Sequence, residues 1–363
     1  MKIQAAVTRE KGKFELDTIE LAAPKSGEVL IKMVASGICH TDTAVLNQFL
    51  PVTFPMVLGH EGVGIVEDVG PGVMDLKIGD HVIMSFPSCG VCEKCHEGHP
   101  YVCDESFKLF FGGVYKDGTK RLSDDKGEIA VMFGQGSFAN YAVVDERNAV
   151  KVDDDVDLKA LCSLGCGVQT GAGAVLNRMK PTPGSSIVVF GCGAVGMSGI
   201  MAAKLAGCST IIAVDTVPSR LELAKELGAT HVINGKECNT PDEVKKITGK
   251  GVNYGLEATG VPMLVPQMLD SMAREGLAVI VGVTGEAEAP IRLEPQLMSP
   301  SVTLAGLVEG GSNPKVFIPQ LVKFFKEGRL PVDKMCKYYK FEEIEQAFHD
   351  SHTGEVIKPV LCF

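Results

Sequence analysis

The stretch Ser186-Ile187-Val188-Val189-Phe190-Gly191-Cys192-Gly193-Ala194-Val195-Gly196 decides the fold of the middle of the chain. A short run of apolar and β-branched residues predicts a buried strand over 186–190. The glycines that follow have the spacing G-x-G-x-x-G and open an apolar helical segment, which is the context of a dinucleotide-binding turn. The first glycine makes the turn, the second admits a pyrophosphate, and the third packs the helix on the strand. The predicted contacts of the coenzyme phosphates are Gly191, Gly193, Ala194, Val195 and Gly196.

Strand and helix patterns alternate on both sides of this turn. Further strands are predicted at 210–215, 231–234, 254–258, 278–283 and 302–304, with helices between them such as 219–227. Regular βαβ alternation predicts a doubly wound parallel sheet of the Rossmann type. Asp215 ends the second strand, where a carboxylate binds a ribose 2′-hydroxyl and repels a 2′-phosphate, so NAD is favoured over NADP. Arg220 is a candidate contact on the adenosine side, although a solvated helix residue is an equal alternative, and Val283 is a candidate at the end of its strand.

The N-terminal part has a different texture, with short strands interrupted by Gly and Pro. Strands are predicted at 29–34, 63–69 and 82–84, with a short helix at 39–46. This pattern predicts an irregular β-barrel-like domain. The C-terminal tail returns to mixed structure, with helices at 314–327 and 341–349 and a last strand at 356–362.

Four of the 12 cysteines form one tight cluster with the spacing C-x₂-C-x₂-C-x₇-C. Four thiolates so close together can close a tetrahedron around Zn²⁺, and a metal with every position filled by protein serves to fold a loop. Free buried cysteines and an iron–sulfur cluster are the alternatives. The predicted ligands of this structural zinc are Cys89, Cys92, Cys95 and Cys103.

A second candidate metal site combines three distant residues that lie next to glycines. His60 stands in Gly59-His60-Glu61-Gly62-Val63-Gly64, Cys39 follows Gly37-Ile38, and Cys166 lies between Gly165 and Gly167. Two thiolates and one imidazole are the ligand set of a catalytic zinc that keeps its fourth position open for substrate.

Length, charge and composition limit the classes of function. A chain of 363 residues is long enough for two domains. Its net charge of −10 and pI near 5.4 argue against a nucleic-acid partner. The longest uncharged apolar run, 187–203, is interrupted by glycines and falls short of a membrane span, and no cleavable signal is visible. We therefore expect a cytoplasmic protein without membrane association.

With these motifs, the whole chain resembles the zinc-dependent medium-chain alcohol dehydrogenases, whose catalytic zinc has such a Cys₂His ligand set. Within that family it looks most like the benzyl (aryl) alcohol dehydrogenases. The resemblance implies an α/β protein in which a GroES-like irregular β-barrel catalytic domain is split around an inserted Rossmann domain. The implied ranges are 1–167 and 306–363 for the catalytic domain and 168–305 for the NAD domain.

The resemblance also implies roles for single residues. Asp42 would orient the ligand histidine, Thr41 would bond the substrate hydroxyl, Glu61 would be the acid near the metal, and Lys358 would stand near the pyrophosphate. Ala44 replaces a histidine that relays the proton in many relatives, so His40 or water is the hypothetical end of that route.

The resemblance implies two Zn²⁺ ions per subunit, NAD as cofactor, and a homodimer or homotetramer. Ser85, where several relatives have a bulky aromatic residue, predicts a roomy apolar pocket together with the aromatic residues at 107–111 and 133. The expected reaction is the reversible oxidation of a primary, aromatic or allylic alcohol to its aldehyde. The alternatives are an aliphatic or glutathione-linked alcohol dehydrogenase, a non-catalytic nucleotide-binding relative, and a zinc-lobe protein that acts on nucleic acid.

Overall fold

The computed structural model describes residues 1–363 and divides into two compact units. Unit 1 comprises residues 1–166, 313–327 and 332–363, and unit 2 comprises residues 167–312 and 328–331. No helix combines the length and the apolarity that a membrane crossing requires.

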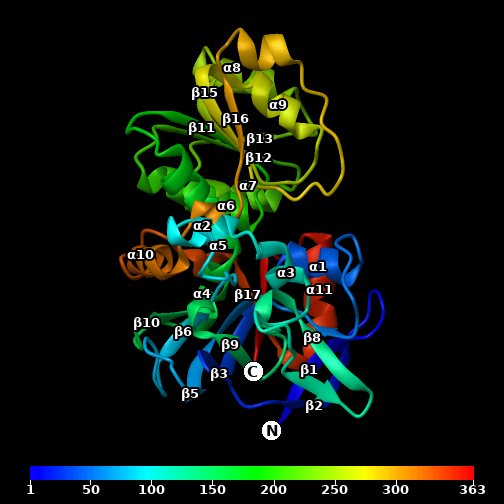
Figure 1. Ribbon diagram of the computed structural model, residues 1–363. Coiled ribbons are helices and arrows are strands. Elements are labelled where there is room, and N and C mark those ends of the chain that lie inside the picture. The colour runs from blue at the N-terminus through cyan, green and yellow to red at the C-terminus, as the bar shows by residue number, and fades with distance from the viewer. The chain divides into compact units, whose positions relative to one another are not determined.

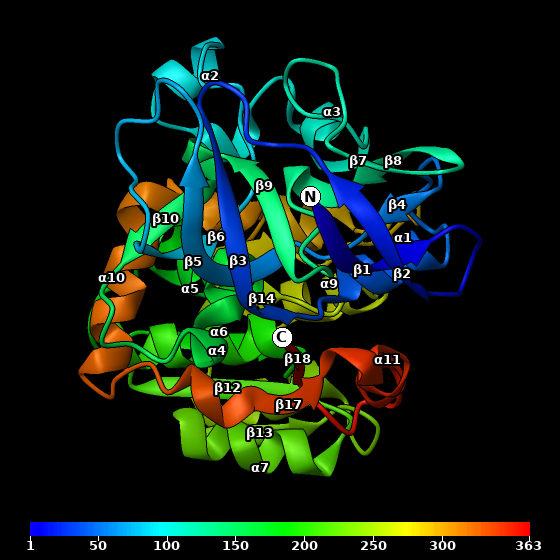
Figure 2. The same cartoon turned by 90° about the horizontal axis from the view of Figure 1, so that it is seen from below.

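Unit 1 contains a closed barrel and a larger sheet (Figure 1). The barrel strands are β1 (Lys2–Thr8), β2 (Glu15–Leu21), β7 (Leu122–Asp124), β8 (Gly127–Val131) and β4 (Met56–Val57). The sheet has the order β10 (Ala149–Val152), β6 (His81–Met84), β5 (Glu61–Val69), β3 (Glu28–Gly37), β18 (Lys358–Cys362) and β17 (Cys336–Lys340), and β9 (Tyr141–Asp145) also pairs with β3. Figure 2 shows β9, β3, β5 and β6 side by side.

The helices of unit 1 are short apart from two in the C-terminal tail. They are α1 (His40–Leu46), α2 (Glu93–His96), α3 (Ser106–Phe111), α4 (Leu158–Leu161), α10 (Pro314–Lys326) and α11 (Ile344–Thr353). The main core of this unit joins the barrel strands to α1, α3 and α11, and side chains such as Ile3, Val57 and Phe138 are almost fully buried in it. Burial of such side chains contributes roughly 1.5–3 kcal/mol each.

Unit 2 is a doubly wound parallel sheet, as the sequence predicts. Its strands have the order β13 (His231–Asn234), β12 (Thr210–Asp215), β11 (Ser186–Phe190), β14 (Val252–Glu257), β15 (Met272–Ile280) and β16 (Thr303–Gly306), and every pair is parallel. The helices are α5 (Gly167–Gly173), α6 (Ala194–Leu205), α7 (Pro218–Leu227), α8 (Thr240–Thr248) and α9 (Leu264–Asp270). Helix α6 packs against β11, β12 and β14, whereas α9 packs against β14 and β15.

The predicted bounds of β11, β12 and β13 are confirmed to the residue. The central strand β11 is buried from Ile187 to Phe190, which explains its continuous apolar run. The prediction for β15 was wrong at both ends: the strand runs from Met272 to Ile280 and not over 278–283, so Val283 lies beyond its end. Met272 pairs with Val252, and the register shifts after this pair. The charged residues 274–275 interrupt the apolar pattern, so the pattern did not predict a strand there.

Candidate metal centres and nucleotide site

The three residues predicted to hold a catalytic metal come together in unit 1. Cys39 precedes α1, His60 precedes β5, and Cys166 follows a 3₁₀ turn over 162–165. Their ligand atoms all lie within 4.8 Å of one another. His60 is 1% exposed and Cys166 is 8% exposed, whereas Cys39 is partly exposed.

The donor atoms of this cluster fit a zinc ion. The Nε2 atom of His60 is buried and has no hydrogen-bond partner, while Nδ1 lies 3.0 Å from Asp42 Oδ1. If Nδ1 donates to the carboxylate, the lone pair of Nε2 faces the two thiols. The pKa of Cys39 lies well below its usual range. A hydrogen bond with Cys166 is the main cause, and the neighbouring His60 lowers the pKa further, although burial opposes both effects. A Cys39 thiolate and the buried, unpartnered Nε2 of His60 are the kinds of ligand that Zn²⁺ prefers.

The charge around His60 also favours a cation. Burial by itself lowers the pKa of His60, but Asp42 and the Cys39 thiolate outweigh it and raise the pKa well above its usual value. A divalent ion bound at Nε2 would satisfy the same preference for positive charge.

Asp42 is a fully buried carboxylate that fixes two of the ligands. Its Oδ2 accepts the Cys39 amide at 2.9 Å, and its Oδ1 accepts the Gly59 amide at 3.1 Å in addition to its contact with His60. Gly59 has φ +93°, and a Cβ there would lie 2.7 Å from the Phe138 nitrogen. This position therefore requires glycine, and the carboxylate holds the backbone on both sides of the cluster.

Lys358, which the resemblance places near the pyrophosphate, is 2% exposed and belongs to unit 1. Its Nζ donates to Glu61 Oε2 at 2.6 Å and to the Ile38 carbonyl at 3.0 Å. Burial raises the pKa of Glu61, and Lys358 opposes that effect. The two residues form a buried ion pair, and Glu61 follows the predicted metal ligand His60 directly in the sequence.

Ser85 has a different environment from the one expected. It is fully buried, and its Oγ donates to the Gly165 carbonyl at 2.8 Å, one residue before Cys166. Gln135 in turn donates to the Ser85 carbonyl at 2.8 Å. The Ser85 hydroxyl therefore fixes the backbone next to the metal ligand Cys166. Nothing in the local sequence indicates these roles of Ser85 and Gln135.

Aromatic side chains stack against the metal cluster. The ring of Phe133 lies 4.7 Å from the His60 ring at an interplanar angle of 28°, and 4.3 Å from the Phe110 ring at 17°. Phe111 meets Phe133 edge-on, and Phe107 at the outer end is 72% exposed. Phe133 has φ +52°, an uncommon backbone conformation for a bulky residue. The fold thus holds this ring against the imidazole at some cost in backbone strain.

The remaining predicted residues of the metal region lie at the start of α1. Thr41 is half-buried, with its Oγ1 3.8 Å from Cys39 Sγ, so its hydroxyl stands beside the ligand cluster. His40 is exposed. Ala44 is buried and has no group that carries a proton.

The four-cysteine lobe is also assembled. The sulfur atoms of Cys89, Cys92, Cys95 and Cys103 lie within 4.8 Å of one another. Backbone amides point at the sulfurs: Cys89 N lies 3.2 Å from Cys103 Sγ, and Cys92 N lies 3.3 Å from Cys89 Sγ. Four converging sulfurs with N–H···S bonds fit a closed tetrahedral zinc site.

The glycine turn in unit 2 connects β11 to α6, as predicted. Gly193 precedes α6, and a Cβ there would meet nothing within 4 Å, so a ligand could approach the backbone. A Cβ on Gly196 would lie 1.7 Å from the Gly191 oxygen, which explains the third glycine. Ala194 and Val195 form the first turn of α6, whose N-terminus attracts anions.

The other predicted coenzyme contacts lie on separate elements of unit 2. Asp215 ends β12, where its Oδ2 accepts the Cys192 amide at 2.7 Å and its Oδ1 accepts the amides of the next two residues. Arg220 lies in α7 and is half-buried. Val283 follows β15 and is 58% exposed. The structure therefore brings Asp215 to the glycine turn, because the carboxylate bonds the turn itself.

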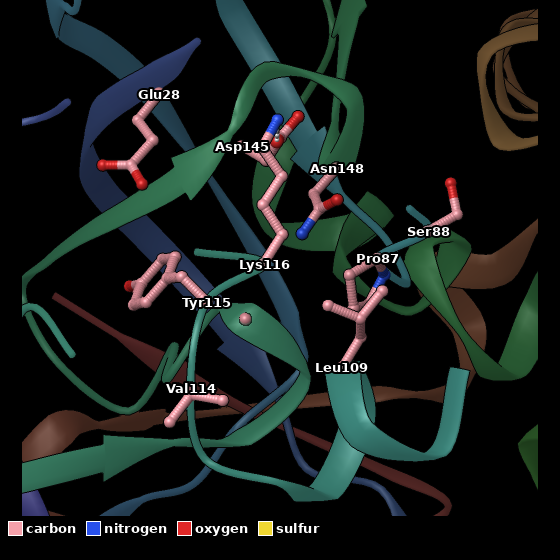
Figure 3. Close-up of a pocket in the computed structure, with 10 residues that line it drawn as sticks. Glu28, Pro87, Ser88, Leu109, Val114, Tyr115, Lys116, Asp145 and Asn148 are labelled. Atoms are coloured by element: carbon pink, nitrogen blue, oxygen red, sulfur yellow. Dashed lines mark ion pairs between the residues drawn. The ribbon is translucent and has the colours of Figure 1, made fainter. Parts of the chain in front are cut away.

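A small pocket in unit 1 lies apart from these ligands (Figure 3). Its volume of about 20 Å³ is enough for one water molecule. The residues that line it include Glu28, Pro87, Tyr115, Asp145 and Asn148, and none is a predicted metal ligand. A pocket of this size is too small to hold an alcohol substrate.

The sequence matches two family models. Residues 25–154 match the alcohol dehydrogenase GroES-like domain, and residues 194–327 match the zinc-binding dehydrogenase family. A geraniol dehydrogenase from Castellaniella defragrans is 40% identical over 365 residues, which cover 99% of this chain and 97% of that protein.

Solved structures agree with this match. The benzyl alcohol dehydrogenase of Acinetobacter calcoaceticus has a TM-score of 0.97 at 46% identity, covering 100% of this chain and 99% of the other. An alcohol dehydrogenase zinc-binding domain protein from Burkholderia ambifaria has a TM-score of 0.98 at 47% identity with the same coverage.

Proposed function

Because the chain belongs to the zinc-dependent medium-chain alcohol dehydrogenases, we propose that it oxidises aromatic or allylic primary alcohols to aldehydes, with NAD as the hydride acceptor. Zinc and a nicotinamide dinucleotide are the cofactors of this family. The observation that carries the substrate class is the stack of Phe110 and Phe133 on the metal ligand His60. Both faces of Phe133 are covered, by His60 and by Phe110, so a flat ring or an allylic double bond would meet the edges of these rings, where edge-to-face contacts are favourable. The named relatives act on geraniol and benzyl alcohol.

Cys39, His60 and Cys166 would hold the catalytic zinc, which acts as a Lewis acid and makes an alcohol hydroxyl more acidic. Asp42 keeps the His60 ring in the orientation and tautomer in which Nε2 faces the cluster. Thr41 would accept a hydrogen bond from the substrate hydroxyl and pass its proton outward. The exposed His40 or water would receive that proton, since Ala44 cannot.

Cys89, Cys92, Cys95 and Cys103 would hold the second zinc, whose role is to fold the lobe. The preference for NAD rests on Asp215. A carboxylate at the end of β12 repels the 2′-phosphate of NADP.

The test is a panel of benzyl, cinnamyl, geranyl and ethyl alcohols with NAD and with NADP, read by absorbance of the reduced coenzyme. We expect kcat/KM to be highest for the unsaturated alcohols and for NAD. Phe133→Leu should lower the ratio of kcat/KM for benzyl alcohol to kcat/KM for ethanol by roughly 2- to 10-fold. The reason is that an aromatic contact contributes about 0.5–1.5 kcal/mol. Phe107→Leu is the matched control, because this exposed ring lies at the far end of the same cluster.

Ethanol as the best substrate, or equal ratios in both phenylalanine variants, would refute the aromatic preference. Higher kcat/KM with NADP would refute the argument from Asp215. Activity that depends on added glutathione would favour the glutathione-linked alternative.

A further inference from the structure

Arg147 joins the four-cysteine lobe to the sheet of unit 1. It lies in a 3₁₀ turn over Glu146–Asn148, between β9 and β10. Its Nη1 donates to the Cys89 carbonyl at 2.8 Å, while Nε and Nη2 hold the two oxygens of Asp145 at 3.1 and 3.2 Å. Cys89 is the first ligand of the lobe, so one guanidinium binds the entry of the lobe to the end of β9.

Asp145 is itself held from several directions. It accepts the Arg147 amide at 3.1 Å as the cap of the turn, and Lys116 Nζ lies 2.8 Å from its Oδ2 (Figure 3). Burial raises the pKa of Asp145, but Arg147 and Lys116 outweigh it and lower the pKa below the usual value. The carboxylate therefore stays charged at neutral pH and gives the guanidinium a fixed anchor.

Gly90 makes room for this arrangement. It has φ +75°, and a Cβ placed there would lie 1.7 Å from Arg147 Nη1. Any side chain at position 90 would push the guanidinium away from the Cys89 carbonyl. Two observations thus explain glycine at position 90: the backbone of Gly90 has a positive φ, and the Arg147 guanidinium fills the space where a Cβ would lie.

The lobe has an electrostatic need that an arginine can meet. One Zn²⁺ with four thiolates carries a net charge of −2. Burial by itself lowers the pKa of Arg147, but Asp145 first, and then Cys89 and Cys95, outweigh it and raise the pKa. A guanidinium is weakly hydrated and presents several donors in a fixed plane, so it can serve the carbonyl, the carboxylate and the nearby sulfur charge together.

We propose that Arg147 is a positioning residue of the structural zinc site, one that offsets the charge of the four thiolates and fastens the entry of the lobe to the sheet. This inference rests on the assignment of zinc to Cys89, Cys92, Cys95 and Cys103. Partners that orient metal ligands from outside typically change metal affinity by about 10- to 100-fold when they are removed.

The experiment uses the full-length, zinc-loaded protein and measures zinc release into a chromogenic chelator. Loss of activity is followed in parallel and marks release from the catalytic site. Arg147→Ala should speed release from the lobe by about 10-fold or more, while release from the catalytic site stays unchanged. Arg147→Lys should be intermediate, because an ammonium keeps the charge but cannot bind the carbonyl and both carboxylate oxygens.

Gly90→Ala should reproduce the effect of Arg147→Ala, since it displaces the guanidinium. Gly98→Ala is its matched control: this lobe glycine has φ +82° and open space around its Cβ, so it carries similar backbone strain without touching the arginine. Lys94→Ala removes a positive charge from the lobe at an exposed ion pair with Glu97. Lys94→Ala should release zinc at the wild-type rate, and Gly98→Ala should show only the smaller acceleration that backbone strain alone produces.

Release from the lobe at the wild-type rate in Arg147→Ala, or equal acceleration in Gly90→Ala and Gly98→Ala, would overturn the proposal. A wild-type protein that binds only one zinc per chain, and releases it in parallel with the loss of activity, would overturn the lobe assignment, and the proposal with it. That result would leave the catalytic zinc and the proposed alcohol oxidation standing.

Discussion

The buried pair of Lys358 and Glu61 gives the sharpest prediction for stability. The side chains are almost fully buried, and the ammonium lies 2.6 Å from the carboxylate and 3.0 Å from the Ile38 carbonyl. Lys358→Met fills much of the same space but leaves the Glu61 carboxylate buried without its cation. Removal of one partner of such a pair costs about 3–5 kcal/mol.

That cost corresponds to a melting temperature lower by roughly 6–20 °C for a unit of this size. The assay is thermal unfolding at neutral pH by circular dichroism or calorimetry. Glu61 raises the pKa of Lys358 despite burial, so the stabilising effect of the lysine charge is complete at neutral pH and is lost as the pH rises through the raised lysine pKa. The matched control is Lys326→Met, which removes an exposed ion pair with Asp153 and Asp155 and should leave the melting temperature nearly unchanged.

The double variant Glu61→Gln/Lys358→Met separates pairing from packing. It removes both charges, so it should be more stable than Lys358→Met alone, with a coupling energy of about 2–3 kcal/mol. Additive losses in the double variant, or a single Lys358→Met variant as stable as Lys326→Met, would refute the ion-pair reasoning.

Three further predictions concern the metal sites and acid stability. Asp42→Asn should weaken zinc binding at the catalytic cluster by about 10- to 100-fold in a chelator competition, because the His60 ring loses its anionic partner; unchanged affinity would contradict this. Cys39→Ser should abolish activity in a folded protein, whereas Cys89→Ser should mainly lower the melting temperature, and equal loss of kcat at normal stability in both would argue against two separate roles. Hydrogen bonds from Tyr339 and then from neighbouring side chains lower the pKa of Asp350 to about 2. Its stabilising effect should therefore be present above about pH 4 and lost toward pH 2, so that Asp350→Asn and wild type converge in acid unfolding; a constant difference would oppose this.

The parts of the fold and of the sites that could be predicted from the sequence are those whose residues lie close together in the chain. The apolar run of β11, the glycine turn after it and the four closely spaced cysteines each carry their meaning within a few residues. The fold class and the family follow from these patterns. The three-residue metal cluster was harder, since its members are far apart in sequence, and it depended on a resemblance to a known family.

The features that sequence reasoning missed depend on contacts between distant segments. Lys358 and Glu61 are 297 residues apart, and Ser85 and Gly165 are 80 apart. A lysine near the end of a chain is ordinarily an exposed residue, and a serine after a strand is ordinarily a turn residue. Only the packing of β18 against β3, and of the segment before Cys166 against β6, gives these side chains buried partners.

The glycines around the catalytic cluster explain why the cluster can be rigid. A Cβ on Gly37 would lie 2.3 Å from Glu61 Oε2, and a Cβ on Gly165 would lie 2.0 Å from the Met84 oxygen. The space beside each ligand is thus filled by an atom of a neighbouring strand, so these glycines give close packing and not mobility. A ligand held by backbone in this way has few alternative positions, which is the condition for a preorganised metal site. It follows that alanine at Gly37 or Gly165 should disturb the geometry of the ligands more than it disturbs the larger sheet of unit 1.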